Sequence, residues 1–279
     1  MYSNLKKEVR LFNDNFDIKL TDTPYLRFLD HIEEGVEVKA NTTEINGTDG
    51  VLMGPTTFGP FNLVLNFSFR GLDTKDLILQ KQKLRNILFR RVPYYIWHSD
   101  APGKKYLVYC DSNENEDLTH SFATFKVTFV VVKGYSESLR DTNDIELLQE
   151  RVQFEQGLEL AEKLQYKHKT KSFKIYNGST DVIDPLMRHK LIIKLSAEAP
   201  NGFKIRNKTT KDVFEYKKKL KKSQAFVLNG VYPYVDKKRV GVDTNYSYIT
   251  LAPGENNIVI EGDGVEQIDI EFIFNFIYR

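Results

Sequence analysis

Short segments in which every second residue is apolar recur along the whole chain, and they constrain its fold more than any other feature. The most regular of them carries five apolar side chains at alternate positions: Ile268, Ile270, Phe272, Phe274 and Phe276. A period of two places these side chains on one face of an extended strand. The same alternation over residues 61–69 and 191–195 predicts two further strands with one buried face. The chain is therefore predicted to be mainly β.

Glycine, proline and asparagine pairs separate these segments at intervals of about ten residues, which is typical of antiparallel sandwiches of the jelly-roll or lectin type. The composition agrees, because 19 Phe and 15 Tyr stand against 3 Met, and aromatic side chains fit a pleated, half-buried surface. Hydrophobic residues make up 41% of the chain, which is enough for packed cores and excludes disorder as its main state.

The charge balance and the cysteine count exclude several classes of protein. The 40 Lys and Arg and 38 Asp and Glu leave a net charge of +2, so recognition of nucleic acid or of an anionic membrane by bulk charge is excluded. The single cysteine, Cys110, forbids an intrachain disulfide and excludes the cysteine-rich zinc classes. Charged residues interrupt the first twenty positions, and the apolar stretch 127–132 is far shorter than a membrane span. We expect a soluble protein that folds in a reducing cytoplasm.

The length of 279 residues predicts two domains. In the first half, Asp73 can cap a helix whose leucines recur at helical spacing and which ends before Pro93. A second helical pattern covers residues 141–164, and a lysine-rich stretch follows it. The expected organisation is a first domain over residues 1–135, a helical linker over 136–170 and a second β domain over 171–279.

Residues 41–60 contain four turn pairs in a short stretch, and we interpret them as an extended, hairpin-like arm. Gly supplies positive φ angles and Pro fixes its own φ, so such pairs mark turns and extended loops. An arm of this kind gains strand pairing from a neighbouring chain, which satisfies an otherwise open edge. The residues predicted to form the interface of this arm with a neighbouring chain are Asn46, Gly47, Asp49, Gly50, Phe58 and Phe61.

The sequence contains none of the catalytic motifs that we sought: a nucleophile elbow, a phosphate-binding loop, a zinc-protease motif or a dinucleotide fingerprint. The five histidines have no ligand-like spacing, whereas a metal site needs three or four converging ligands. Cys110, in a predicted strand, is interpreted as a small buried apolar residue. We therefore predict no enzymatic activity, no metal and no cofactor.

Two groups of carboxylates leave a glycan hydrolase open as an alternative, because retaining chemistry needs two carboxyl groups about 5 Å apart. One group is expected in an acidic loop: Asp111, Glu114, Glu116 and Asp117. The other is spread over the second half: Asp236, Asp243, Asp263, Asp269 and Glu271. Solvated carboxylates on turns and strand faces are the simpler explanation for both groups.

A glycan-binding adhesin is a further alternative, since aromatic side chains can stack on the apolar face of a sugar ring. Tyr232 and Tyr234 are the candidate contacts in the second domain. Packing at strand ends explains them more simply, and the single tryptophan, Trp97, lies in the first domain. The lysine-rich stretch 217–222 is interpreted as a solvated hairpin tip that can meet an acidic partner.

The order of these elements and several short motifs resemble one known family. The first half carries Asn46-Gly47-Thr48-Asp49-Gly50, the alternating strand, the helix, Tyr94-Tyr95-Ile96-Trp97 and Pro102-Gly103-Lys104-Lys105-Tyr106. The second half carries Ile175-Tyr176-Asn177-Gly178, Asp184-Pro185 and, as the most specific motif, Leu251-Ala252-Pro253-Gly254-Glu255-Asn256-Asn257. On these residues the chain resembles the distal tail (Dit) proteins of phages with long non-contractile tails that infect Gram-positive bacteria.

The resemblance implies both a fold and a role. The first domain is expected to be a tail-tube-like β-sandwich or split barrel with one helix and a hairpin arm, and the second a galectin-like β-sandwich. Six copies are expected to close into a ring between the major tail tube protein and the tail-tip protein that carries the spike or lysin, with receptor-binding or other baseplate proteins docked outside. The expected location is the virion, at the distal end of the tail, after assembly in the host cytoplasm.

Overall fold

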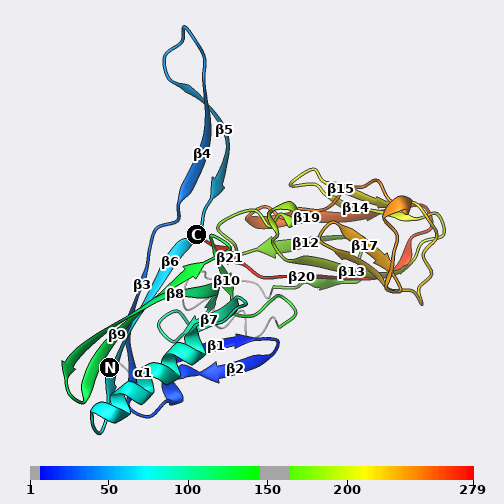
Figure 1. Cartoon of the computed structure of the whole chain (residues 1–279). Helices are drawn as coiled ribbons and strands as arrows, with labels where there is room; N and C mark the ends of the chain where they lie inside the picture. Colours follow the sequence, from blue (N-terminus) through cyan, green and yellow to red (C-terminus); the bar gives the residue numbers. More distant parts are fainter. Residues whose placement is uncertain (1–6, 145–163) are drawn as a thin grey trace. The chain divides into compact units, whose positions relative to one another are not determined.

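The computed structural model describes residues 7–144 and 164–279 of the chain. These residues divide into two compact units: the first runs to Ser136 and includes Arg279, and the second covers Glu137–Tyr278. Both units are built from antiparallel sheets, and Thr74–Leu88 forms the α-helix α1 (Figure 1). The predicted mainly β fold with a helix in the first half is therefore confirmed. No helix of the described residues is long and apolar enough to cross a membrane.

The first unit is organised around one sheet with the strand order β2-β1-β7-β8-β9-β6-β3. Its strands are β1 (Val9–Asn13), β2 (Phe16–Lys19), β3 (Leu26–Glu33), β6 (Phe61–Arg70), β7 (Tyr94–His98), β8 (Lys104–Thr119) and β9 (Phe122–Val131). Strands β2 and β3 stand at opposite ends of this order, so the sheet stays open in the described part of the chain and does not close into a barrel.

One face of this sheet and α1 enclose the core of the first unit. Four alternating residues of β6 are buried there, as their period predicts: Leu63, Leu65, Phe67 and Phe69. Three leucines on one side of α1 pack into the same core: Leu77, Leu84 and Leu88. Asp73 caps the helix, because its carboxylate accepts a hydrogen bond from the backbone N–H of Asp76 over 2.8 Å.

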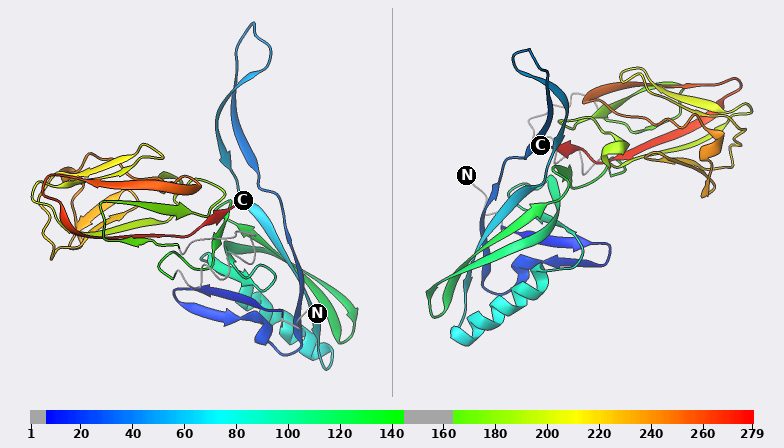
Figure 2. Two further views of the ribbon diagram at one scale, coloured as in Figure 1. Left: turned by 180° about the vertical axis from the view of Figure 1, so that it is seen from behind. Right: turned by 45° about the horizontal axis from the view of Figure 1, so that its top comes forward.

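Strands β4 (Val38–Glu44) and β5 (Val51–Phe58) form a separate two-stranded sheet. This hairpin extends away from the main sheet of the first unit in each of the ribbon views (Figures 1 and 2). An arm therefore lies where the cluster of turn pairs predicts one, and its first strand begins slightly earlier, at Val38.

The second unit consists of two sheets packed face to face (Figure 2). Their strand orders are β11-β20-β13-β16-β17-β18 and β12-β19-β14-β15. The strands are β11 (Lys167–His168), β12 (Ser172–Asn177), β13 (Leu191–Glu198), β14 (Phe203–Asn207), β15 (Val213–Tyr216), β16 (Phe226–Asn229), β17 (Tyr232–Val235), β18 (Lys238–Arg239), β19 (Gly254–Glu261) and β20 (Glu266–Phe274). The short strands β10 (Ser136–Ser138) and β21 (Ile277–Tyr278) pair with each other. Three 3-10 turns cover Leu20–Asp22 in the first unit and Pro185–Met187 and Gly241–Asp243 in the second.

Aromatic rings join the two sheets of this sandwich. Phe203 on β14 and Phe226 on β16 have ring centroids 5.0 Å apart. Phe173 on β12 and Phe272 on β20 have ring centroids 6.1 Å apart. The alternating aromatic residues of β20 thus pack in a core between the two sheets. The β-sandwich predicted for the second half is confirmed.

Two local predictions have a different outcome. The carboxylates of 111–117 were predicted in a loop, but they lie within β8, which continues to Thr119 and pairs with β9. The sequence analysis was wrong here because this end of β8 is mostly exposed, so that no apolar period marks it as a strand. The helix predicted over 141–164 lies largely outside the described residues, and its described part, 141–144 and 164, is not helical.

Candidate assembly interface

The hairpin arm has two strand edges that are open in the described part of the chain. Its strands pair from Val38 and Phe58 at the base to Glu44 and Val51 near the tip, with an irregularity after Ala40. No third strand of the described residues joins them. Open edges present unpaired N–H and C=O groups, and a lone two-stranded hairpin is marginally stable in water. The arm thus has the backbone chemistry of a segment that is completed by a partner.

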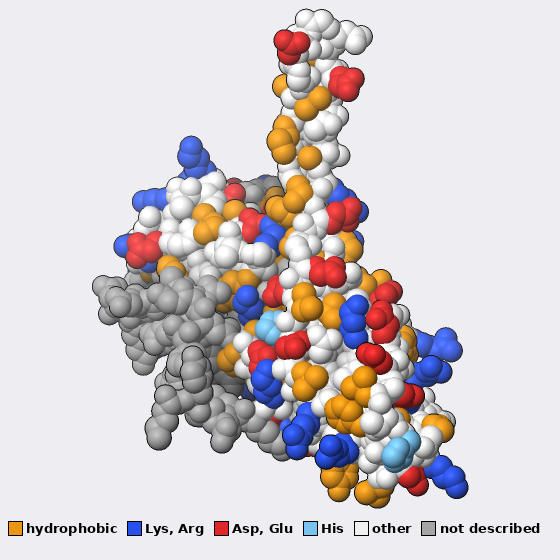
Figure 3. Space-filling model, turned by 90° about the vertical axis from the view of Figure 1, so that its left-hand side faces the viewer, with side chains coloured by type: hydrophobic (Ala, Val, Ile, Leu, Met, Phe, Trp, Pro, Cys, Tyr) orange, Lys and Arg blue, Asp and Glu red, His pale blue; other side chains and the backbone are white. Residues whose placement is uncertain are grey.

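Large apolar side chains are exposed along this arm, and we call them the arm patch: Val38, Ile45, Val51, Leu52, Met53 and Phe58. Met53 is the most exposed of them, at 68%. Figure 3 shows apolar side chains along the length of the arm and acidic ones near its tip. Contiguous apolar surface on a soluble protein usually marks an interaction site.

The tip of the arm brings together four of the predicted interface residues: Asn46, Gly47, Asp49 and Gly50. Gly47 and Gly50 have φ angles of 86° and 81°, a conformation that favours glycine. Thr48 donates hydrogen bonds from its backbone N–H and its hydroxyl to the carbonyl of Ile45, over 3.2 and 3.0 Å. The tip is therefore a defined turn, as the Asn-Gly and Asp-Gly pairs predict.

The base of the arm holds the other two predicted residues in different environments. Phe58 is exposed at the end of β5, and the guanidinium carbon of Arg279 lies 4.1 Å from its ring centroid. The backbone N–H of Gly59 donates to Glu37 over 2.7 Å and closes the hairpin. Phe61, by contrast, is 5% exposed and packs in the core of the first unit. The prediction placed Phe61 at an interface, but it begins the inward-facing series of β6.

Further exposed apolar residues precede the arm, and the sequence analysis missed them. Leu29 and Ile32 lie on β3, at the edge of the main sheet, and are 41% and 53% exposed. The arm patch was also missed apart from Phe58. One signal was available for it, because Val51-Leu52-Met53 is an apolar run enclosed by turn pairs. The irregular pairing after Phe28 obscures the alternation of β3.

Two of the carboxylates weighed for catalysis form ion pairs with lysines. Within residues 7–144 and 164–279, no cluster of three or more His, Cys, Asp or Glu side chains could hold a metal ion. Asp117 pairs with Lys81 over 2.6 Å, and Glu271 pairs with Lys194 over 3.2 Å. Burial raises the pKa of the Cys110 thiol to about 12, so the thiol stays protonated at neutral pH.

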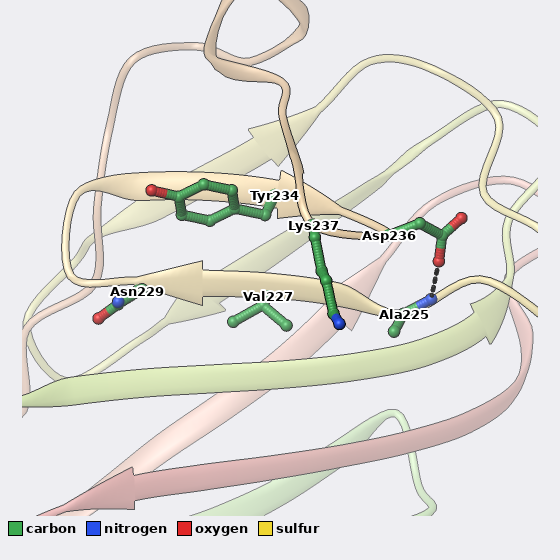
Figure 4. A pocket seen from close by; sticks show the side chains of 6 residues that line it. All are labelled: Ala225, Val227, Asn229, Tyr234, Asp236 and Lys237. Carbon is green, nitrogen blue, oxygen red and sulfur yellow. Dashed lines mark hydrogen bonds between the residues drawn. The ribbon is translucent and has the colours of Figure 1, made fainter.

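The two candidate glycan contacts lie on one outward face of β17. The ring of Tyr232 is 47% exposed, and the guanidinium carbon of Arg239 lies 4.5 Å from its centroid. Tyr234 lines a hollow on the same face of the six-stranded sheet (Figure 4). The period of two thus brings both tyrosines to one surface, although their ring faces have different neighbours.

Comparisons with known proteins agree with this architecture. Residues 16–131 match the family model of the phage tail protein RIFT-related domain, a range that contains the arm and α1. The solved structure of the Dit protein (gp 19.1) of phage SPP1 is similar over 97% of this chain and 99% of that chain, with a TM-score of 0.69 and 13% identity. That protein is described as a paradigm of the hub adsorption apparatus in phages that infect Gram-positive bacteria.

Two structures of the phage p2 baseplate in its activated conformation, with Sr and with Ca, are more distant. They align with TM-scores of 0.45, at 10% and 8% identity, over 96% of this chain and 97% and 98% of the matched chains. No curated protein matches the sequence.

Residues 16–131 are therefore assigned to the RIFT-related domain of phage tail proteins. The fold of the whole chain is that of a Dit hub protein, which confirms the resemblance predicted from the sequence. The similarity to the Dit protein continues through the second unit, where it is a similarity of fold.

Proposed function

We propose that this chain forms a hexameric ring at the distal end of the tail, which joins the tail tube to the tail tip. The arm patch is the observation that carries this proposal. Its six apolar side chains and the two open strand edges lie together on one slender hairpin that leaves the sheet of its own unit. A second copy of the chain supplies the surface that both features need.

The edge strand β3 of the next copy is the surface that fits the arm best. It combines an unpaired strand edge with the exposed side chains of Leu29 and Ile32. An arm that docks there pairs its backbone and buries apolar area in the same contact. Such an interface is head-to-tail, so each copy gives one arm and accepts another, and the rotation closes into a ring. The number six follows from the resemblance to distal tail proteins.

The same resemblance names the partners of the ring. One face would meet the major tail tube protein, and the other would meet the tail-tip protein that carries the spike or lysin. The second unit would dock receptor-binding or other baseplate proteins. The division into a ring-forming domain, a linker at 136–170 and an outer sandwich belongs to this proposal, as does assembly in the host cytoplasm.

Light scattering of the purified full-length chain tests the ring. We expect a mass near six times the 32.4 kDa of one chain. In a shortened variant, Asn-Gly replaces residues 41–55. Ala40 and Thr56 are register partners, so a two-residue turn can join them. This variant is expected to remain folded and to elute as a monomer.

A pair of matched double substitutions separates loss of assembly from loss of folding. Leu52→Lys with Met53→Lys places charges on the arm patch, and Val242→Lys with Tyr246→Lys does so at two exposed positions of the second unit. The first pair should give monomers with unchanged circular dichroism, and the second pair should leave the ring intact. A monodisperse monomer of the unmodified chain at high concentration would overturn the proposal.

A further inference from the structure

The outward face of β16 and β17 carries a hollow of about 610 Å³ (Figure 4). Val227 and Asn229 of β16 line it, together with Ala225, which directly precedes the strand. Val227 and Tyr234 are register partners on the two strands, so the tyrosine lies beside this apolar row. The hollow thus combines an aliphatic floor with an aromatic side chain, and the amide of Asn229 lies at its end. Binding sites for small molecules have this balance of apolar lining and few polar groups.

The turn beside the hollow has an unfavourable residue at a defined position. Asp236 and Lys237 form the two-residue connection between β17 and β18, with φ angles of 48° and 66°. Hairpin turns of this kind favour Asn or Asp first and Gly second. Lys237 therefore holds a left-handed conformation that a glycine would adopt without strain. Strained backbone conformations cluster at ligand-binding and active sites.

The charges at this turn are not equivalent. The carboxylate of Asp236 accepts hydrogen bonds from the backbone N–H of Ala225 over 3.0 Å and from the amide of Gln224 over 3.2 Å. Lys237 has no hydrogen bond or ion pair within the described ranges, and its side chain extends between Val227 and Ala225. Arg239, the register partner of Tyr234, instead places its guanidinium over the ring of Tyr232. The carboxylate of Asp236 is thus hydrogen-bonded within the chain, and the ammonium group of Lys237 is available to bind a ligand.

These groups select a particular ligand chemistry. A sugar ring has an apolar C–H face that can pack on Tyr234, which lines the hollow. Sugar hydroxyls can bind the amide of Asn229. A phosphate or carboxylate on the sugar can pair with Lys237 in a charge-assisted hydrogen bond. We propose that this hollow binds a sugar residue that carries an anionic group.

Titration of the full-length chain with four probes, followed by ligand-observed NMR, tests this site. The probes are glucose 6-phosphate, glucuronate, glucose and inorganic phosphate. We expect one or both anionic sugars to bind with a Kd on the order of 1 mM, and glucose and phosphate to bind at least about 10-fold more weakly. The first two probes distinguish a phosphate ligand from a carboxylate ligand.

Substitutions at the turn and on β17 separate binding from folding. Tyr234→Ala should weaken binding of the anionic sugar at least about 10-fold, and Tyr234→Phe should retain it because the ring remains. Lys237→Gly should lose the preference for anionic sugars while raising the melting temperature by about 2–4 °C, since the backbone strain is relieved. The controls are Lys238→Ala and Tyr246→Ala, two exposed residues outside the lining of the hollow, and both should bind as the parent does.

Three outcomes would overturn the proposal. In the first, none of the four probes binds. In the second, an anionic sugar binds equally to the parent chain, Tyr234→Ala and Lys237→Gly. In the third, a poly-glutamate peptide binds with the same dependence on these residues while the sugars do not, which would assign the hollow to an acidic protein partner. None of them bears on the ring, because the arm lies in the first unit.

Discussion

The side-chain amide of Asn207 donates a hydrogen bond to the side-chain oxygen of Asn256 over 3.0 Å, and both side chains are completely buried. Asn256 also accepts from the backbone N–H of Ala252 over 2.9 Å and donates to the carbonyls of Ala252 and Gly254. One amide thus closes the turn before β19 and ties it to the end of β14. This network gives a physical reason for the asparagine in the Leu251–Asn257 motif.

Replacement of Asn256 by alanine is expected to destabilise the protein strongly. The substitution leaves buried backbone groups of the turn and the amide of Asn207 without partners, which should lower the free energy of unfolding by about 2–4 kcal/mol. Asn257→Ala is the matched control, because that neighbouring side chain is exposed and should change stability by less than about 0.5 kcal/mol. Urea unfolding measures both. Equal midpoints for the two variants would contradict the structural role of Asn256.

The buried imidazole of His98 makes the protein sensitive to acid. Both ring nitrogens lack a hydrogen-bond partner among the described residues, and the ring centroid lies 4.3 Å from that of His31. Burial lowers the pKa of His98 to about 3, and the charge of a protonated His31 acts in the same direction, whereas Asp100 opposes it. An unfolded histidine titrates near pH 6.5. The unfolded chain therefore binds more protons between these two values, and stability falls as the pH decreases from about 6.5 towards 3.

His98→Phe is expected to remove this component of acid sensitivity. The phenyl ring can keep the contacts with Phe28 and Tyr106, whose centroids lie 5.9 and 5.8 Å from the imidazole. Removal of two unsatisfied buried nitrogens should raise the free energy of unfolding at pH 7 by about 1–3 kcal/mol. Between pH 6 and 5 the parent should lose up to about 1.4 kcal/mol more than the variant. Exposed His120→Phe is the control and should keep the parental pH dependence.

Alanine substitutions at two glycines with the same φ angle distinguish the cost of backbone strain from the cost of a steric collision. Gly202 and Gly254 both have φ = 82°, but a Cβ at Gly202 would collide with the carbonyl oxygen of Tyr216, whereas a Cβ at Gly254 meets nothing within 4 Å. Gly254→Ala should cost about 1–2 kcal/mol for the left-handed conformation. Gly202→Ala should cost clearly more, because the backbone of β15 has to move. Thermal unfolding compares them, and equal losses would show that the collision is relieved without cost.

The cap of α1 leads to a second structural prediction for the first unit. The carboxylate of Asp73 binds the N–H of Asp76, and the carboxylate of Asp76 binds the N–H of Leu72 over 3.0 Å in return. Asp73→Ala should lower the free energy of unfolding by about 1 kcal/mol, because a helix-end N–H loses its acceptor. Asp73→Asn preserves the acceptor and should lose much less. Chemical denaturation of both variants measures the contribution of the cap.

Much of the fold could be predicted from the sequence because its causes are local. The alternation in β6 and β20 places their apolar side chains on one face, and Asp73 binds a backbone group three residues away. The Asn-Gly and Asp-Gly pairs at the arm tip supply positive φ angles at the positions that turn. The resemblance to distal tail proteins used the order of these elements, so it depended on local signals as well.

The candidate sites were harder to predict because they depend on partners distant in the sequence. Phe58 and Phe61 are close in sequence and both aromatic, yet Phe58 is exposed on the arm and Phe61, on β6, is buried in the core of the first unit. The register of β16 and β17 sets Tyr234 opposite Val227, and the turn conformation then sets Lys237 at the same hollow.

The β segments, the helix in the first half, the lack of a disulfide and the turn-rich arm follow from the amino-acid sequence alone, because periodicity, capping and turn chemistry act over a few residues. The tertiary structure alone decided which apolar side chains remain outside the cores. The exposure of these side chains depends on how strands that are distant in the sequence pair and pack, and a local sequence pattern does not contain this information. The exposed surfaces that support both proposals therefore became visible once the strands had been placed in their sheets.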